Sequence, residues 1–402
     1  MPITTAASAM FDGITGVYGI VFSLAAAVSA FAGPIVAHHI PYDVCNIILT
    51  LASVLAYITC TLPHPLADAS GENKAGPVVG TALAGFVYAF GTQNYLSVAA
   101  FFPSEAVIAL SIGSGLSIIF GSGIYIALVN RAFVQDWRRC FLVIAPTALL
   151  MPIIWWLVFD KAGRDAAELS RRQSIRKKLP QDSSSDSVEC PDIEKAIIES
   201  TTIIGNSHMA SAASKPGFGP QKSRLGLFLK TILPRYILPL IICTSCAILC
   251  LFGLAPAPET LNRFPDAPAG YLGFELVFFA YGSAQFLFSA LVAVKPIPII
   301  WIWTSIEVVL TAVILLQIWY PFIQHFWVYW VLMFFVGGCV GGSVTNTNYK
   351  ISKDFKEAGE PDEVRSFANS YAGLGNFGGD AIGGSIGLAI QLIVIKHLQP
   401  TP

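Results

Sequence analysis

Charged side chains are scarce in this chain. Asp, Glu, Lys and Arg make up only 12% of its 402 residues, whereas soluble domains carry about 25%. Hydrophobic residues make up 54%, and the mean hydropathy is +0.64. The formal net charge of −1 gives no indication of nucleic-acid binding, and no nucleic-acid partner is expected. This composition excludes an ordinary soluble domain and predicts a protein built largely from membrane-embedded segments.

The chain also lacks the motifs of soluble enzymes and metal sites. No glycine-rich loop follows a strand pattern, no Gly-x-Ser-x-Gly motif stands above chance, and the 6 histidines form no cluster with ligand spacing. Cys243 and Cys246 have the spacing of a zinc or redox motif, but their apolar run contains no histidine, which favours a packing role. No basic segment precedes the first apolar run, so no cleavable signal peptide is expected. We predict no catalytic residue, no metal and no cofactor.

Ten apolar runs dominate the sequence, and each is long enough to cross roughly 30 Å of hydrocarbon. The runs are 14–37, 42–62, 78–101, 106–130, 140–159, 231–254, 271–293, 297–318, 324–347 and 368–395. A polar segment, 161–230, separates two groups of five, and its charges and serines predict a disordered linker. We predict an all-α polytopic membrane protein with a major-facilitator-like fold. Residues 1–160 and 231–402 would each form a helix bundle, one span short of a six-plus-six arrangement.

Basic residues predict the orientation of the spans. They crowd the start of the linker, from Lys161 to Lys178, directly after the fifth run. The positive-inside rule therefore places the linker in the cytosol. The basic residues between the last two runs fall on the same side. Arg131, Arg138 and Arg139 fall on the other side, against the rule.

The ninth run is rich in glycine. Gly337, Gly338, Gly341 and Gly342 form two interleaved Gly-xxx-Gly pairs, a spacing that lets two membrane helices approach closely. Tight helix packing is the favoured interpretation, and a hinge is the alternative. Asn346 follows at the predicted end of this run. It could cap the helix, form an interhelical hydrogen bond or contact a substrate.

Several polar groups lie within the apolar runs. A charge at mid-bilayer costs at least about 2.5–3.5 kcal/mol, so an intramembrane carboxylate needs water, a partner or a proton. Asp380 and Glu307 are the candidates for a substrate or proton pathway, whereas Glu275 lies near the start of its run and could reach the interface. Among the neutral amides, Gln93 and Asn94 are adjacent, so at least one should point into the bundle. Gln285 could line the same cavity.

Two blocks of the sequence share a family pattern. In one, Gly341-Gly342-Ser343-Val344-Thr345-Asn346-Thr347 is followed by Arg365-Ser366-Phe367-Ala368. In the other, Gly91 is followed by Tyr95-Leu96-Ser97, Phe101-Phe102-Pro103 and Gly113-Ser114-Gly115. Their order and spacing resemble those of the battenin family of lysosomal and vacuolar membrane proteins. The resemblance spans most of the chain from about Phe11 onward.

The resemblance implies a transporter-like protein of the vacuolar or lysosomal membrane. It implies a role in vacuolar pH homeostasis and in transport of basic amino acids or glycerophosphodiesters, with the lipid bilayer and protons as further partners. Two alternatives stay open. One is a non-transporting scaffold that regulates vacuolar trafficking or V-ATPase activity, and the other is an unrelated major-facilitator carrier. The sequence leaves the oligomeric state open.

The chain departs from the family pattern at several positions. Thr92 stands where the family has an acidic residue, Ser289 where it has an arginine, and Asn376 where it has an aspartate. Asp380 lies one helical turn after Asn376 and could supply a carboxylate from the same face. The family's first helix has no counterpart, so a divergent or N-terminally incomplete member is expected. We predict alternating access, with Asp380 or Glu307 binding a proton or a cationic group of the substrate.

Overall fold

The computed structural model describes residues 2–36, 39–62, 74–99, 101–102, 104–133, 136–159, 161–176, 226, 228–256, 264–268, 271–297 and 299–398. Within these ranges every regular element is helical. The elements are α1 (Pro2–Thr5), α2 (Ala7–Met10), α3 (Thr15–Val36), α4 (Tyr42–Thr61), α5 (Ala75–Ala99), α6 (Ser104–Ala127), η1 (Leu128–Ala132), α7 (Trp137–Ile144), η2 (Ala145–Leu149), α8 (Leu150–Leu157), α9 (Lys161–Arg176), η3 (Phe228–Ile237), α12 (Leu238–Ile248), η4 (Leu249–Leu254), α14 (Leu272–Val294), α15 (Trp301–Trp319), α16 (Phe326–Glu357) and α17 (Asp362–Leu398).

Ten helical segments in the described ranges are long and apolar enough to cross a membrane, by length and composition. They overlap the ten predicted runs one for one, which confirms the predicted spans. Some spans combine several elements, such as α7, η2 and α8. Pro146, which has no N–H to donate, lies at the start of the tighter η2 turn, where the α-helix of that span is interrupted.

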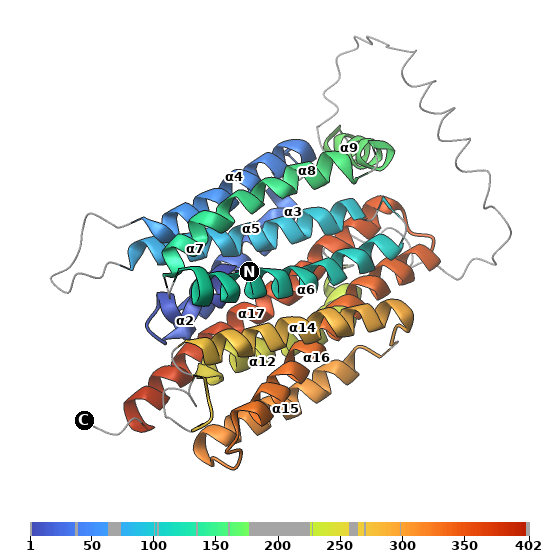
Figure 1. Ribbon diagram of the computed structural model, residues 1–402. Coiled ribbons are helices and arrows are strands. Elements are labelled where there is room, and N and C mark those ends of the chain that lie inside the picture. Colours follow the sequence, from blue (N-terminus) through green and yellow to red (C-terminus); the bar gives the residue numbers. More distant parts are fainter. Residues whose placement is uncertain are drawn as a thin grey trace, which may run out of the picture.

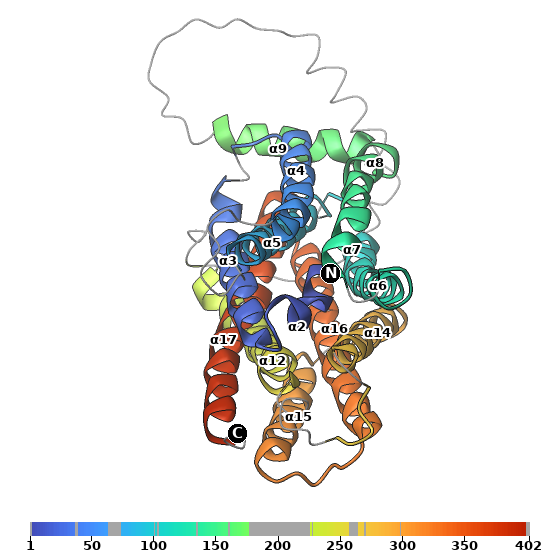
Figure 2. The same ribbon diagram turned by 60° about the vertical axis from the view of Figure 1, so that its left-hand side comes forward.

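Two seams join the part of the chain before the linker to the part after it. We call α1–α9 the N-terminal half and η3–α17 the C-terminal half. At the first seam α3 and α5 pack against α17, and at the second α6 packs against α14 and α16 (Figures 1 and 2). Helices distant in sequence thus lie side by side, and any site between the halves must use residues from these elements.

The spans end on two opposite sides of the molecule. We call the end that carries α9 the linker side, because α9 leads into the polar segment between the halves. It also holds the α16–α17 connection at residues 358–361. Helix α9 lies across the ends of α4 and α8 rather than along the spans (Figures 1 and 2). Arg164 of α9 fixes it there, with its guanidinium over the Trp155 ring and 3.9 Å from the Asp43 carboxylate.

The outer surface of the spans is apolar, whereas many polar groups are buried. Phe31 and Leu51 are each 65% exposed, and Leu157 is 81% exposed. Such side chains face lipid tails in a membrane, so apolar burial adds little to helix association, and close packing and interhelical hydrogen bonds take its place. The buried polar groups therefore position helices or form a site.

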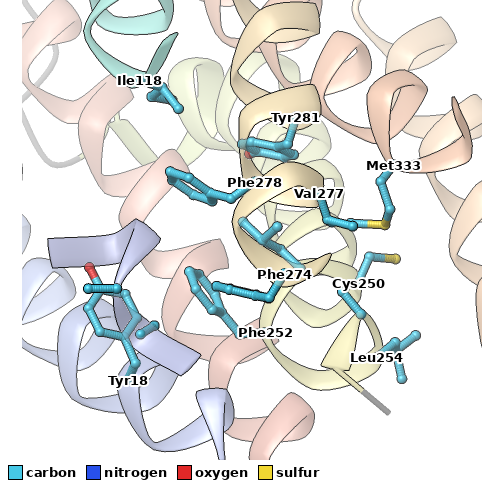
Figure 3. Close-up of a cluster of buried hydrophobic side chains, with 14 of the residues drawn as sticks. Tyr18, Ile118, Cys250, Phe252, Leu254, Phe274, Val277, Phe278, Tyr281 and Met333 are labelled. Carbon is cyan, nitrogen blue, oxygen red and sulfur yellow. The ribbon is translucent and has the colours of Figure 1, made fainter. Parts of the chain in front are cut away.

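An aromatic cluster in the interior spans both halves (Figure 3). The ring of Tyr18 in α3 lies 5.2 Å from that of Phe252 in η4, and Phe252 lies 6.3 Å from Phe274 in α14. One helical turn further along α14, Phe278 stacks on Tyr281 at 6.2 Å. This cluster leads from the first span to Tyr281, which borders the polar interior described below.

Two predicted boundaries were wrong. The ninth span was expected to end at residue 347, but α16 continues as one helix to Glu357. The linker was expected to be disordered from residue 161, but Lys161–Arg176 forms α9. Glu168 stabilises α9 locally through ion pairs with Arg171 and Arg172, three and four residues later. Residues 177–225 lie outside the described ranges. They make up most of the remaining predicted linker.

Candidate functional site

Asp380 is a buried carboxylate at the first seam, and its side chain is 7% exposed. It lies on α17 and interacts electrostatically with two tyrosine hydroxyls, Tyr88 of α5 and Tyr281 of α14. Among the described residues its carboxylate has no hydrogen bond and no ion pair. An ionised carboxylate in such surroundings is costly, so Asp380 is suited to binding a proton or a cationic group.

Tyr88 approaches Asp380 because it packs against Phe377, which lies one helical turn before Asp380 on α17. The ring of Tyr88 meets Phe377 edge to face, with 5.3 Å between ring centroids. Phe377 is fully buried against Ala26, Ala30 and Ala89 of the N-terminal half. Because Asp380 follows Phe377 by three residues on the same helix, this contact places the carboxylate where α5 and α17 meet.

Glu307 is also fully buried, but it lies within the C-terminal half. Its helix, α15, packs against α12, α16 and η4, on the side remote from the N-terminal half (Figure 2). The Cys339 thiol of α16 faces the carboxylate, and no N–H or O–H group of the described residues donates to either oxygen. Tyr281 lies within electrostatic range of both Glu307 and Asp380.

The amide of Gln93 connects three helices of the first seam. Its Nε2 donates to the carbonyl oxygens of Ala30 at 2.7 Å and Ser370 at 3.2 Å. Glycines make room for it, since a Cβ at Gly33 would lie 2.5 Å from its Oε1 and one at Gly373 would lie 2.7 Å from its Cγ. Its Nε2 is thus occupied by the protein, and its buried Oε1 is without a partner among the described residues.

Asn346 occupies an interior helical position and is 1% exposed. Its Oδ1 accepts the backbone N–H of Ile297 at 2.9 Å, and its Nδ2 donates to the Gly342 carbonyl at 2.9 Å. It therefore holds the α14–α15 connection against α16. The expected position at the end of the helix was wrong, because the helix continues through polar residues, and both amide groups are used within the protein.

The four glycines of α16 face two kinds of neighbour. A Cβ at Gly337 would lie 2.1 Å from the Tyr281 carbonyl oxygen, and one at Gly341 would lie 2.3 Å from that of Gln285. These two positions let the backbones of α14 and α16 approach closely. A Cβ at Gly338 would lie 3.0 Å from the Phe288 ring and one at Gly342 would lie 2.6 Å from the Trp303 ring.

The other predicted polar residues do not contact Asp380 through a hydrogen bond among the described residues. Glu275 is 4% exposed near the end opposite the linker side, where the amide of Asn130 donates to its Oε2 at 3.5 Å. Asn376 is half-buried, and its backbone carbonyl accepts the Thr244 hydroxyl at 3.1 Å. Asn94 is 5% exposed, and its Oδ1 has no partner among the described residues.

Sequence reasoning missed Tyr88, Tyr281 and Asn369. Asn369 is 1% exposed, and neither polar atom of its amide has a partner within the described residues. Asn369, Asn376 and Asp380 recur at positions i, i+7 and i+11, so they share one face of α17. That spacing was a usable signal. The tyrosines gave none, because aromatic residues are common throughout the apolar runs.

Comparisons with known proteins address identity. A search of curated proteins gave no match. The proton:xylose symporter XylE, of the major facilitator superfamily, was solved with 6-bromo-6-deoxy-D-glucose and is similar in structure, with a TM-score of 0.52. The similarity covers 99% of this chain and 92% of XylE at 12% sequence identity, so it shows a shared major-facilitator-like fold. The family model described as CLN3 protein matches residues 17–397. The chain therefore belongs to the CLN3 (battenin) family of membrane proteins.

Proposed function

We propose that this protein is a carrier of small polar solutes in the vacuolar or lysosomal membrane and that it works by alternating access. Its solutes are basic amino acids or glycerophosphodiesters, proton movement accompanies their transport, and the linker side faces the cytosol. Its activity contributes to vacuolar pH homeostasis. The observation that carries the proposal is the buried carboxylate of Asp380, which lies at the first seam between the two halves, within electrostatic range of Tyr88 and Tyr281.

The position of Asp380 supports a coupling role. Alternating access moves one half against the other around a site near the membrane midplane. Asp380 belongs to the C-terminal half, while Tyr88 belongs to the N-terminal half and packs against the same helix. Rocking of the halves changes the surroundings of this carboxylate, so binding of a proton or an ammonium group there depends on the conformation.

The remaining polar groups take separate parts in this proposal. Asn94 and Asn369 have buried amide atoms without partners among the described residues, and such atoms can bond to a solute or to water. Glu307 is buried inside the C-terminal half without a hydrogen-bond donor among the described residues and acts as a second proton site. Gln93 and Asn346 position helices, because their amides bind backbone groups.

One observation favours the scaffold alternative. Where the family pattern has an arginine, Ser289 donates to the Gly341 carbonyl at 3.2 Å and accepts from Thr345 at 3.0 Å. This position thus serves helix packing and supplies no cation for an anionic solute. A scaffold that regulates trafficking or the V-ATPase would need no such cation.

Efflux from isolated vacuoles tests the proposal. A strain without this protein is complemented with the wild type, with Asp380→Asn, or with Asp165→Asn, whose carboxylate is exposed on α9. Efflux of arginine and of glycerophosphodiesters is then measured at equal protein abundance. The wild type and Asp165→Asn should restore efflux, and Asp380→Asn should not. Full rescue of efflux by Asp380→Asn would refute the mechanism. The scaffold would be supported if the strain without the protein shows normal efflux and its trafficking defect is corrected by complementation.

A further inference from the structure

Helix α17 is bonded to the N-terminal half near both of its ends. Ser366 makes the contact on the linker side, and Gln391 makes the contact on the opposite side. They are separated by 25 residues, which corresponds to roughly 37 Å at 1.5 Å per residue, about the thickness of the membrane. A single helix thus links one half to the other on both sides.

The linker-side contact joins two serines across the first seam. The Ser366 hydroxyl donates to the Ser97 carbonyl at 3.1 Å, and the two hydroxyl oxygens lie 2.7 Å apart. A hydroxyl has one proton, so Ser97 must donate to Ser366, and the Tyr42 hydroxyl at 3.4 Å then donates to Ser97. Tyr42 is buried against Trp155 and Ala167, the latter from α9. Helix α9 therefore covers this contact.

On the side opposite the linker, the side-chain amide of Gln391 forms two hydrogen bonds with the turn that precedes α3. Gln391 is 1% exposed, its Oε1 accepts the N–H of Gly16 at 2.8 Å, and its Nε2 donates to the Gly13 carbonyl at 2.9 Å. Gly16 lies in the first turn of α3, where backbone N–H groups have no partner within the helix. Gly13 has a φ of 82°, a conformation that suits glycine and turns its carbonyl to Gln391.

The second seam also carries one polar contact near each side, but these are longer. Asn348 donates to Ser111 at 3.4 Å, and Asn130 donates to Glu275 at 3.5 Å. The contacts of α17 are shorter and each supplies two hydrogen bonds, so they restrain separation of the halves more strongly than the second-seam contacts do. On the side opposite the linker, the Thr15 hydroxyl, one residue before Gly16, also donates to the Phe252 carbonyl at 2.8 Å.

We propose that the Ser97–Ser366 pair and the Gln391–Gly13/Gly16 clasp are alternating latches, each of which must open for the protein to open on its side. This inference rests on the proposed alternating-access function. Because α17 is continuous, the latch that stays closed serves as the pivot while the other opens. The structure holds both latches closed. Helix α9 shields one latch and thereby favours closure of the linker side.

A disulfide across the linker-side latch tests the proposal. With Ser97→Cys and Ser366→Cys the two thiols replace oxygens 2.7 Å apart, close enough to join under mild oxidation. The matched control is Ser289→Cys with Thr345→Cys, whose oxygens lie 3.0 Å apart within the C-terminal half. Wild-type protein, which keeps its own cysteines, is oxidised in parallel. Efflux from proteoliposomes should fall at least tenfold for the first pair and recover with dithiothreitol, while the control pair keeps its transport rate. Wild-type transport by fully cross-linked Ser97→Cys/Ser366→Cys protein would overturn the proposal.

Hydrogen exchange provides a second test that needs no transported solute. In full-length protein in nanodiscs, Gln391→Ala should speed amide exchange in the turn at residues 13–17 about tenfold, the effect of losing roughly 1.4 kcal/mol of local stability. It should also slow exchange around Ser97 and Ser366. Ser366→Ala should do the reverse. If each variant speeds amide exchange at its own latch without slowing it at the other latch, the proposal that the latches alternate is wrong. Reciprocal exchange in a protein that moves no solute would contradict the proposed function and leave the latches standing.

Discussion

The glycines between α14 and α16 permit a quantitative prediction. A Cβ at Gly341 would lie 2.3 Å from the carbonyl oxygen of Gln285 and 2.8 Å from its Cα, both backbone atoms. Ordinary contact begins at 3.4 Å, so Gly341→Ala requires the helices to separate by about 1.1 Å (3.4 − 2.3). Overpacking typically costs about 1–3 kcal/mol. Because backbone atoms cannot rotate away, we expect a loss near or above 3 kcal/mol.

The matched control is Gly378→Ala on α17, where a Cβ would meet no atom within 4 Å. Alanine is the better helix former by up to about 1 kcal/mol, so this variant should be as stable as the wild type or slightly more stable. The assay is the apparent unfolding temperature in nanodiscs, together with the free energy of unfolding in SDS. If Gly341→Ala unfolds like Gly378→Ala, the close approach of α14 and α16 is not what these glycines provide.

Two further predictions concern Asn346 and α9. Asn346→Ala leaves the partly buried N–H of Ile297 without its acceptor and removes both hydrogen bonds of the Asn346 amide, so it should destabilise the protein by about 1–3 kcal/mol in the same SDS titration while KM stays unchanged. A raised KM at wild-type stability would instead indicate a solute contact. Partial burial raises the pKa of the Glu168 carboxyl, but hydrogen bonds from Arg171 and Arg172 outweigh it and hold the pKa below its usual value. A lowered pKa gives stability that is present above the unfolded value of about 4.3 and lost as pH falls through the folded value. The protection factors of the α9 amides, which correct for the slower intrinsic exchange at acid pH, should therefore fall at acid pH, and Glu168→Gln should show that lower protection at pH 7. Equal protection factors at both pH values in the wild type would contradict the assignment.

The membrane spans could be predicted because each needs about twenty apolar residues, and the composition shows them directly. Helix ends could not be predicted in the same way. Hydrophobicity marks where a helix leaves the lipid, whereas α16 continues through Tyr349–Glu357, where charged residues alternate with buried apolar ones, to a C-terminal turn at Gly359, whose φ is 71°. For the same reason Asn346 was expected at a helix end and lies inside a helix.

The partners of buried polar groups depend on tertiary neighbours, which one sequence does not reveal. Asp380 and Glu307 are alike in sequence, since both are acids within apolar runs. The structure separates them, because Asp380 lies at a seam between the halves and Glu307 lies inside one half. Tyr88 and Tyr281 become relevant only because packing brings both residues within electrostatic range of the same carboxylate.

The central claim is that Asp380 binds the proton whose movement accompanies solute transport. Purified protein is reconstituted into liposomes that contain a pH-sensitive dye, and proton and solute fluxes are recorded together after addition of arginine or a glycerophosphodiester. The wild type should move protons in a fixed ratio to solute. Asp380→Asn, matched for folding and incorporation, should show no solute-dependent proton flux. A proton flux in Asp380→Asn equal to that of the wild type, at the same ratio to solute, would contradict the account.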